Sequence, residues 1–374
     1  MADRSRYRVP VLAKSLDVLE CFRTIREELS LEQVIRRTGV AHTTAFRILS
    51  TLVERGYLSQ LPGKKYRLNN FRRRPRLGFA TLTQLTTFAV AVAEGLERAA
   101  ECSGFELRMH DNDRDPQRAV ANAKAIVAQG VDVAIEFQRH YQVAPMIADI
   151  FSTAGIPTIA ILIPQPGAVY FGVNNYRAGL DAGYKLAEYA VEHWSGHFDL
   201  LVLLDIAQGG TVLQSRMTGV LRGIEEELGT VSSTQVVRVD GKGTQEDSAR
   251  TTATALRRHP KARNILISAA SDESALGARD AICAAGLSKT AAIVGHGGSD
   301  EVWACIEDPE SPVVGTVKFF PERYGRGLVE LALRILRGEQ VPPSLYMPHE
   351  VVTRWAQPRP LPAAPRVGAI RRPL

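Results

Sequence analysis

The sequence lacks the features that mark membrane, disulfide-stabilised and exported proteins. The chain of 374 residues has no run of about 18 consecutive apolar residues, so we predict no membrane span. Its four cysteines are scattered and form no CxxC pair, which predicts reduced thiols rather than a disulfide framework or a zinc site. The first residues, MADRSRYRVPVLAKSLDVLECF, lack the apolar core and the cleavage site of a signal peptide, and we therefore expect the protein in the cytoplasm.

Recognisable catalytic motifs are also missing. The sequence has neither a GxSxG nucleophile elbow nor a GxxxxGK[ST] phosphate loop. The stretch HWSGH places His193 and His197 four residues apart, but Ser195 and Gly196 between them would break a helix. Carboxylates are numerous, yet none are paired in an order typical of acid–base catalysis. We therefore predict a protein that is not an enzyme and that uses no metal or other cofactor.

Charge is distributed unevenly along the chain. Residues 1–76 contain 17 Lys and Arg against 7 Asp and Glu, a net charge of +10, whereas residues 77–353 contain 24 against 33, a net charge of −9. Residues 354–374 add five arginines and no acidic residue. A basic head on an acidic body is typical of a phosphate-binding module joined to a second domain. A basic surface that only contacts water has the same composition.

The basic head has the pattern of a small helical domain that ends in a hairpin. An amphipathic segment, AKSLDVLECFRTI, precedes Ser30, which is a good N-cap for a short helix that stops at Gly39. A third helix follows and ends at Gly56, and YLSQLPGKKYRL then predicts a hairpin with its turn at 62–64. This order of elements is that of a winged helix-turn-helix domain, which we assign to residues 1–70.

The third helix of the head combines a buried face with a polar tip. In TGVAHTTAFRILSTLVERGYL, residues 38–58, helical spacing buries the set Ala45, Ile48, Leu49, Leu52 and Val53. The polar tip consists of His42, Thr43, Thr44 and Arg47. Short hydroxyls and an arginine suit contacts with base edges and phosphates, and this helix enters the major groove by its N-terminal end in winged helix-turn-helix domains. Helix capping by the threonines is the alternative.

Residues 11–68, which include LSLEQVIRRTGVAHTTAFRILSTLVERGYL and then YRL, resemble the N-terminal domain of IclR-type bacterial regulators. The resemblance implies that the polar tip faces the groove of double-stranded DNA. It also implies phosphate contacts from the wing, through Lys64, Lys65 and Arg67. Residues 71–76, FRRRPR, then form a basic linker that either follows a phosphate backbone or is a solvated joint.

The body, residues 77–353, changes to strict alternation of strands and helices. Short apolar runs such as FELRMHD, VDVAIEF, IPTIAIL, DLLVLLD, NILISAA and AAIVGHG are separated by amphipathic helical segments. Such alternation predicts parallel sheets with helices on both faces. Ligands of such sheets bind at the carboxyl ends of the strands. The proline- and arginine-rich residues 354–374 show no periodicity and are predicted to be disordered.

The body resembles ribose-binding proteins and the sensor domains of LacI-type regulators, both of which have the periplasmic-binding-protein fold. The similarity is carried by pieces such as AKAIVAQGVDVAIEF, SDESALGARDAICAAGL and VVGTVKFFPERYGRGLVELALRILRGE, in that order. It implies an α/β fold of two lobes, joined by a three-stranded hinge, with the ligand between them. We assign about 77–173 and 321–343 to the first lobe, and about 174–320 and 344–353 to the second.

The resemblance also implies which residues face the ligand. These cleft positions are Thr86, Phe88, Gln138, Arg139, Asn174, Asn175, Gln214, Arg216, Asp240, Asp272, His296 and Phe319. Four positions depart from ribose-binding proteins: an Asp-Arg pair is replaced by Leu162 and Ile163, an aspartate by Gly297, and a glutamine by Phe319. We therefore expect a modified sugar, a less polar cyclic polyol or another small metabolite rather than a simple pentose. The alternatives are that the two asparagines only cap a helix and that Phe319 belongs to the core.

Together these patterns predict a ligand-responsive transcription regulator that binds a DNA operator as a homodimer and senses a sugar-like effector. The LacI resemblance implies repression in the absence of ligand. Closure of the lobes would change the placement of two heads relative to half-sites about one helical turn apart. The alternative is a solute-binding component of a sugar transport system, against which the basic head and the missing signal peptide argue.

Overall fold

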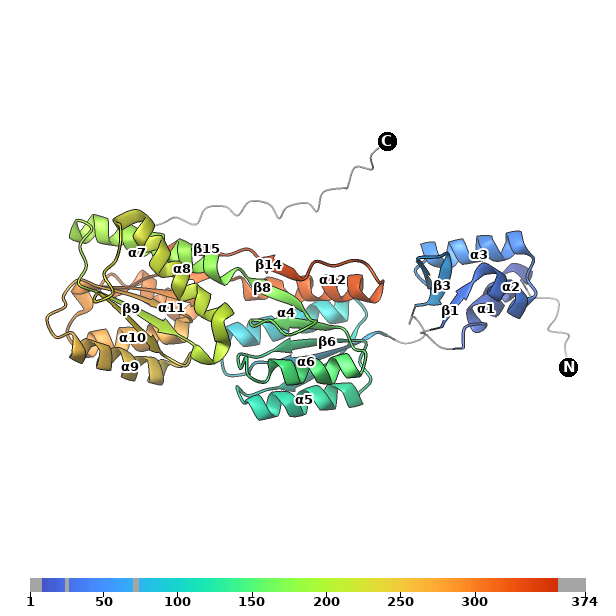
Figure 1. Ribbon diagram of the computed structural model, residues 1–374, viewed down its shortest axis with the longest axis horizontal. Helices are drawn as coiled ribbons and strands as arrows, with labels where there is room; N and C mark the ends of the chain where they lie inside the picture. The colour runs from blue at the N-terminus through green and yellow to red at the C-terminus, as the bar shows by residue number, and fades with distance from the viewer. Residues whose placement is uncertain (1–8, 24–26, 70–73, 356–374) are drawn as a thin grey trace, which may run out of the picture.

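The computed structural model describes residues 9–23, 27–69 and 74–355, which fold into a small head and two larger lobes (Figure 1). Residues 71–73 of the predicted linker 71–76, and residues 356–374 of the predicted disordered tail, lie outside the described residues. Arg76, which the sequence places in the linker, is instead the first residue of strand β4 (Arg76–Thr81), because it pairs with Glu106 of the neighbouring strand.

The head consists of helices α1 (Pro10–Glu20), α2 (Leu31–Thr38) and α3 (His42–Glu54) and strands β1 (Glu28–Ser30), β2 (Leu58–Leu61) and β3 (Lys65–Leu68). The Ser30 side chain accepts a hydrogen bond from the Gln33 amide, and the Gln33 side chain bonds the Ser30 amide in return, so a capping box starts α2. Gly39 ends α2 with a φ of 68°. The predicted winged helix-turn-helix is therefore present, with one addition: β1 pairs with β3 to make a three-stranded sheet.

The first lobe is a parallel sheet of six strands in the order β14-β8-β7-β6-β4-β5. After β4, its strands are β5 (Glu106–Asp111), β6 (Val133–Phe137), β7 (Thr158–Ile161), β8 (Val169–Val173) and β14 (Ser344–Met347). Helices α4 (Thr87–Cys102) and α12 (Tyr324–Leu336) pack with one cluster of core residues, and α5 (Pro116–Ala128) and α6 (Ala144–Thr153) with another. The inner strands β6 and β7 are buried on both sides, as expected for a parallel sheet between helical layers, whereas the edge strands β5 and β14 are not.

The second lobe repeats this architecture with one strand reversed. Its sheet has the order β10-β9-β11-β12-β13-β15, and only β15 (Glu350–Thr353) runs antiparallel to its neighbour. The other strands are β9 (Leu200–Asp205), β10 (Val236–Asp240), β11 (Ile265–Ala269), β12 (Ala291–Gly297) and β13 (Val313–Lys318). The helices are α7 (Asn175–Trp194), α8 (Gly210–Leu228), α9 (Gln245–Arg258), α10 (Asp272–Ala284) and α11 (Asp300–Glu307).

The chain passes between the lobes three times: from β8 to α7, from β13 to the short 3-10 turn Pro321–Arg323 before α12, and from β14 to β15. The third passage corrects the predicted lobe boundary, which placed all of 344–353 in the second lobe. Residues 344–347 belong to the first lobe, because β14 pairs in parallel with β8 and Leu345 packs on the first lobe's core. Only the residues from Glu350 pair with the second sheet.

Candidate DNA-contacting face and interlobe cleft

The polar tip of α3 points away from the core of the head. Ala45, Ile48, Leu49 and Leu52 are buried as predicted, whereas Val53 is only half-buried. His42, Thr43 and Arg47 are exposed, and Thr44 is half-buried. The N-cap residue is Ala41, which makes no side-chain capping bond, so neither threonine is the N-cap of α3. The tip therefore offers hydroxyl, imidazole and guanidinium groups to a partner.

One further residue of this face was not among the predicted contacts. Phe46 is 50% exposed although its neighbour Ala45 is fully buried. The helical period could have found it, because Phe46 does not fit the spacing of the buried positions. An exposed aromatic ring next to Arg47 gives the face an apolar patch of the kind that contacts thymine methyl groups.

The wing presents its basic residues around a tight turn. Gly63 and Lys64 both have positive φ, 79° and 56°, and this geometry closes the turn between β2 and β3. The Lys65 ammonium lies 3.6 Å from the Glu28 carboxylate, in an exposed pair. Such pairs contribute little, so the lysine can exchange its partner for a phosphate. Arg67 is half-buried, and its guanidinium lies beside Gly338, which follows α12 in the first lobe. Its Nη2 is 3.6 Å from the position that a Cβ atom on Gly338 would occupy.

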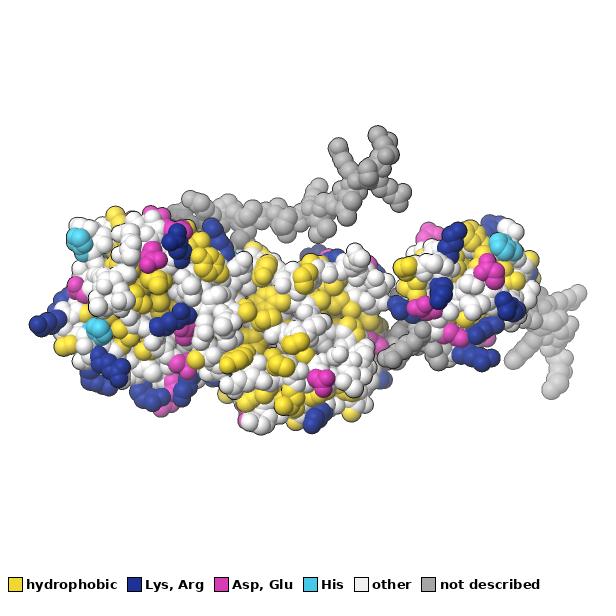
Figure 2. All heavy atoms as spheres, in the orientation of Figure 1, with side chains coloured by type: hydrophobic (Ala, Val, Ile, Leu, Met, Phe, Trp, Pro, Cys, Tyr) yellow, Lys and Arg dark blue, Asp and Glu magenta, His cyan; other side chains and the backbone are white. Residues whose placement is uncertain are grey.

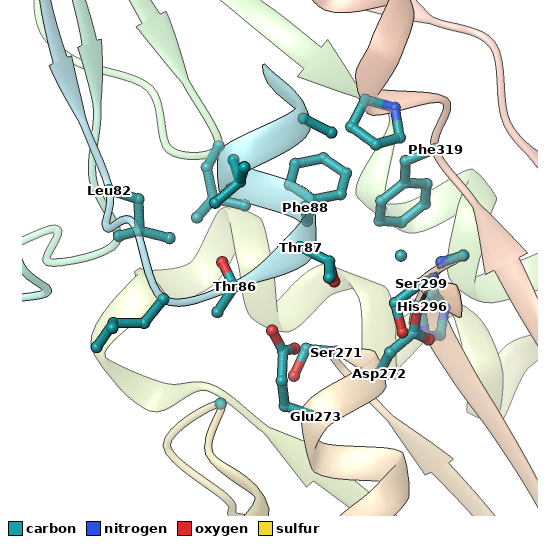
Figure 3. Close-up of a pocket in the computed structure, with 18 of the residues that line it drawn as sticks. Leu82, Thr86, Thr87, Phe88, Ser271, Asp272, Glu273, His296, Ser299 and Phe319 are labelled. Atoms are coloured by element: carbon teal, nitrogen blue, oxygen red, sulfur yellow. Dashed lines mark hydrogen bonds between the residues drawn. The ribbon is translucent and has the colours of Figure 1, made fainter. Parts of the chain in front are cut away.

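A cavity of about 540 Å³ lies between the lobes, within the range usual for small-molecule sites. Most of the apolar residues in its lining come from the first lobe, including Leu82, Phe88, Phe137 and Leu162, and the second lobe lines it mainly with polar ones. Figure 3 shows the Phe88 and Phe319 rings together at one end, and Asp272, His296 and Ser299 gathered beside them. Of the predicted ligand contacts, those in the lining are Thr86, Phe88, Arg139, Arg216, Asp272, His296 and Phe319.

Arg216 is the most deeply placed cation of the cavity. It is 3% exposed, and its Nη2 donates to Asn175 Oδ1 at 2.6 Å while another nitrogen donates to the Ala270 carbonyl. Its guanidinium carbon lies 4.9 Å from the centre of the Phe319 ring. Burial lowers the pKa of Arg216 to about 10. The residue is held in place by the crossing of α7 and α8, where a Cβ on Gly179 would stand 1.8 Å from the Arg216 carbonyl oxygen.

Asp272, the first residue of α10, organises the glycine-rich loop 297–299. Its Oδ2 accepts hydrogen bonds from the Gly298 and Ser299 amides at 2.6 and 2.7 Å, and its Oδ1 accepts one from the Thr316 hydroxyl at 2.7 Å. Burial raises the pKa of Asp272 to about 6. With these three bonds made, the carboxylate supports the loop and has little capacity left for a ligand.

His296 is fully buried at the end of β12, and its Nδ1 lies 2.8 Å from the Ala269 carbonyl oxygen. Desolvation holds the pKa of His296 well below its usual value, so the ring is neutral near pH 7. We assign the single proton to Nδ1 because only a donor can bond that carbonyl. The other ring nitrogen, Nε2, has no partner among the described residues.

The structure gives the other predicted cleft residues different surroundings and places them outside the lining, which corrects the predicted cleft. Asn174 is the N-cap of α7, as in the capping alternative, and accepts a bond from the Arg177 amide at 3.0 Å. Asn175 is no cap but the partner of Arg216, so it acts on the cavity through that side chain.

Three further predicted positions are also outside the cavity. Gln138 is buried and accepts a bond from the His140 amide at 2.5 Å. Gln214 lies on α8 two residues before Arg216, where helical spacing turns its side chain away from the cavity. Asp240 accepts bonds from the Ala207 and Lys242 amides and so fixes two loops.

The cavity also contains residues that the sequence did not single out, among them Arg114, Ser271, Glu273 and Lys318. Ser271 and Glu273 flank Asp272, so the carboxyl end of β11 could have suggested them. Arg114 could not be found in this way. It has a φ of 57° in the turn after β5, and its place depends on the shape of that turn.

No helix in the described ranges is long and apolar enough to cross a membrane. Within the same ranges, no three or more His, Cys, Asp or Glu side chains are grouped so as to hold a metal ion.

The structure has two α/β lobes, each built on a largely parallel sheet, which are joined by three crossing segments and enclose a cavity. This is the architecture of a binding protein that closes around a ligand. The chain belongs to the periplasmic binding protein domain family, whose family model matches residues 77–340. Residues 11–62 match the IclR helix-turn-helix domain. The head is thus of the IclR helix-turn-helix type and the body of the periplasmic-binding-protein type, and neither matched family is an enzyme family.

Known relatives match the body. The ribose import binding protein of Bacillus subtilis (strain 168) is 24% identical over 283 residues, which are 74% of this chain and 87% of that protein. The ribose import binding protein of Escherichia coli (strain K12) is 23% identical over 260 residues, which are 68% of this chain and 82% of that protein. Among solved structures, a glucose-galactose binding protein from Geobacillus stearothermophilus superposes with a TM-score of 0.66, at 20% identity, over 77% of this chain and 100% of its own. A solute binding protein from Bacillus halodurans C-125 with bound myo-inositol gives 0.65, at 20% identity, over 76% and 96%.

Proposed function

We propose that this protein is a transcription regulator that binds an operator through its head and a sugar or sugar-like metabolite in the interlobe cavity. The observation that carries the proposal is the presence in one chain of an exposed polar tip on α3 and a two-lobed fold with a cavity of about 540 Å³. A protein that only transports or stores a ligand has no use for a winged helix-turn-helix head.

In this proposal α3 enters the major groove of double-stranded DNA. His42, Thr43, Thr44 and Arg47 read base edges, and the wing residues Lys64, Lys65 and Arg67 contact phosphates. The net charge of +10 over residues 1–76 supports this assignment, because phosphate contacts supply much of the affinity of such domains. DNA binding also requires a location in the cytoplasm.

The effector binds between the lobes and holds them together. In the cavity, Phe88 and Phe319 provide apolar surface for one side of a sugar-sized ring, and Arg139 and Arg216 donate hydrogen bonds to it. Thr86, Asp272 and His296 complete the polar lining. No metal or other cofactor enters this scheme.

The signal passes through the lobes to a pair of heads. Ligand binding stabilises the closed lobes, and closure shifts the relative position of the two heads in a homodimer. Heads that no longer match the spacing of two half-sites leave the operator. We therefore propose a repressor that the effector releases from DNA.

The test is binding of the purified full chain to the DNA upstream of its own gene and to a scrambled duplex, at two salt concentrations. We expect selective binding that weakens steeply as salt rises. Arg47→Ala should lose about 1–3 kcal/mol of discrimination between the two duplexes, with Arg222→Ala, at an exposed position of α8 in the body, as the control. Equal, weak binding of both duplexes by the wild type would contradict the regulator.

A solute-binding role in sugar transport is the second candidate, because the relatives of the body include ribose import binding proteins. The same purified protein distinguishes the two functions. A transport component would bind sugar without any preference between the two duplexes, whereas a regulator would show a preference that the effector changes.

A further inference from the structure

The cationic groups of the cavity lack the partners that buried cations normally have. Arg114 and Arg139 enter it from the loops that follow β5 and β6 in the first lobe, and Arg216 enters from α8 in the second. The Nε atoms of Arg114 and Arg139 are buried, and neither has a hydrogen-bond partner among the described residues. Arg216 is bonded only to an amide oxygen and a carbonyl, neither of which is charged.

Among the described residues, the carboxylates that line the same cavity form no ion pair with these arginines. Glu94 and Glu322 are exposed at its mouth and pair with Arg98 and Arg323. Asp300 is exposed as well, and Asp272 uses both oxygens to hold its loop. Glu273 is half-buried and extends into the cavity in Figure 3. Its negative charge and that of Asp240 offset only part of the effect of burial and of Arg114 on Arg139.

Arg114 and Arg139 lie close enough to repel each other. The pKa of Arg139 is lowered to about 10, chiefly by burial and next by the positive charge of Arg114. Two like charges that are half-buried beside apolar side chains carry a desolvation and repulsion cost that a bound anion would relieve. Planar guanidinium groups bond carboxylates and phosphates through two parallel hydrogen bonds.

We propose that the effector is a sugar-sized molecule that carries an acid group, a carboxylate or a phosphate, and that Arg114 and Arg139 bind this group. The inference rests on the proposed function, because it concerns the ligand of the same cavity. The Arg139 guanidinium reaches across to the second lobe, where its Nη1 would stand 3.0 Å from a Cβ on Gly243. An acid group bound there therefore sits where the lobes meet and favours their closure.

The experiment compares matched neutral and acidic probes by calorimetric titration of the full chain. The probes are D-glucose, D-gluconate and D-glucose 6-phosphate, together with D-ribose, D-ribonate and D-ribose 5-phosphate. We expect at least one acid to bind about 10-fold or more tightly than its neutral counterpart, as charge-assisted hydrogen bonds imply. Comparison of the affinities for gluconate and ribonate with those for the two sugar phosphates then shows whether the site prefers a carboxylate or a phosphate.

The variants Arg114→Gln and Arg139→Gln assign the effect to this pair. Each should weaken binding of the preferred acid about 10-fold and change binding of neutral probes much less. Arg139→Lys, which keeps the charge, should recover part of the loss. Arg222→Gln, on α8 and paired with Glu226 at 2.9 Å, removes a surface arginine and should change nothing. Circular dichroism of each variant checks that it is folded.

Equal or tighter binding of the neutral probes would overturn this inference and leave a sugar-sensing regulator in place. An acid preference that survives both substitutions to glutamine would overturn the assignment to Arg114 and Arg139. If no probe of either kind binds while the protein still selects its operator, both this inference and the sugar-like effector are wrong, and the DNA-binding half of the proposed function stands.

Discussion

The two lobes share one architecture but build their sides of the cavity in different ways. The first lobe relies on packed rings: Phe88 lies edge-on to Phe137 and Tyr324, with centroid distances of 6.3 and 5.8 Å. The second relies on hydrogen bonds, from Arg216 to Asn175 and from the loop amides to Asp272. Figure 2 shows the same contrast outside, with more hydrophobic side chains on the visible face of the first lobe. Packed apolar side chains on one side of the cavity, the wall of the first lobe, can repack after a small substitution. Loss of one hydrogen-bonding partner on the other side, the wall of the second lobe, instead leaves polar groups without a bond.

Both lobes nevertheless depend on glycine where two helices cross. In the first lobe, a Cβ on Gly325 of α12 would stand 2.0 Å from the Gly95 backbone of α4. In the second, Gly179 of α7 meets the backbone of α8 at 1.8 Å. The two walls thus differ in chemistry, but in both lobes a glycine lets two helices cross closely. Substitutions can separate this shared feature, the glycine at the helix crossing, from the difference between the two walls.

The largest effect should come from the shared feature. Gly325→Val and Gly179→Val each place a side chain where backbone atoms already lie, so we expect each to lower the free energy of unfolding of its lobe by about 3 kcal/mol or more. Urea denaturation measures the loss, and Glu97→Ala, at an exposed position of α4, is the control. If only one of the two substitutions lowered the free energy of unfolding, close approach of the helices would be required at that crossing alone.

Next in size are substitutions in the walls themselves. Asp272→Ala leaves two half-buried amides and a buried hydroxyl without their acceptor and should cost about 3 kcal/mol, whereas Asp272→Asn keeps one oxygen acceptor and should cost about 1 kcal/mol. In the first lobe, Phe88→Leu should cost only about 1 kcal/mol because the apolar wall can repack. The comparison of walls is wrong if Phe88→Leu proves as damaging as Asp272→Ala in thermal unfolding.

Two buried groups, one in each lobe, should respond oppositely to pH. In the first, burial raises the pKa of Glu136 to about 8, so the folded state favours the neutral acid and the stability it contributes is lost as the pH rises from about 4.5 to about 8. In the second, the pKa of His296 is lowered, so its contribution is present above about 6.5 and lost as the pH falls. Asp272, with its pKa raised to about 6, opposes His296 below that pH but is ionised in both states near pH 8.

The window from pH 6.5 to 8 therefore isolates Glu136. Stability measured by urea denaturation should fall across this window in the wild type and stay level in Glu136→Gln, which retains an oxygen to accept the bond from Asn112. His296→Gln should change this slope only slightly, near pH 6.5 where the unfolded histidine still binds protons, and should alter mainly the acid side. A wild-type stability that rises between pH 6.5 and 8 would show that Glu136 is ionised in the fold.

The sequence predicted features that local chemistry determines. The cap at Ser30, the end of α2 at Gly39 and the turn at Gly63 follow from single residues and their neighbours, and the alternation of strands and helices follows from hydrophobic periodicity. The lobe of β14 was predicted wrongly, because it depends on pairing with β8, more than 170 residues earlier in the chain. Local patterns carry no information on such a partner.

The site shows the same division. Phe88 and Asp272 come after predicted strands and His296 lies at the end of one, where ligands of α/β folds bind, and all three line the cavity. Asn175 was expected at the ligand but bonds Arg216 instead, because the glycines of α7 and α8 bring those helices into contact. Arg114 was missed because a turn with positive φ, rather than a strand end, directs it inward.

The smallest effect should arise where the two lobes touch. The Thr87 hydroxyl of α4 donates to the Glu301 carboxylate of α11 at 3.4 Å, across the cavity mouth and exposed to water. A long, solvated hydrogen bond contributes little, so Thr87→Ala should weaken effector binding by about 3-fold or less, and Thr87→Ser should restore it. Calorimetric titration with the tightest-binding probe measures the change. A loss of effector affinity of about 10-fold or more would mean that closure of the lobes depends on direct contacts between them at the cavity mouth as much as on the ligand. The chemical difference between the two sides of the cavity would then matter less than these contacts.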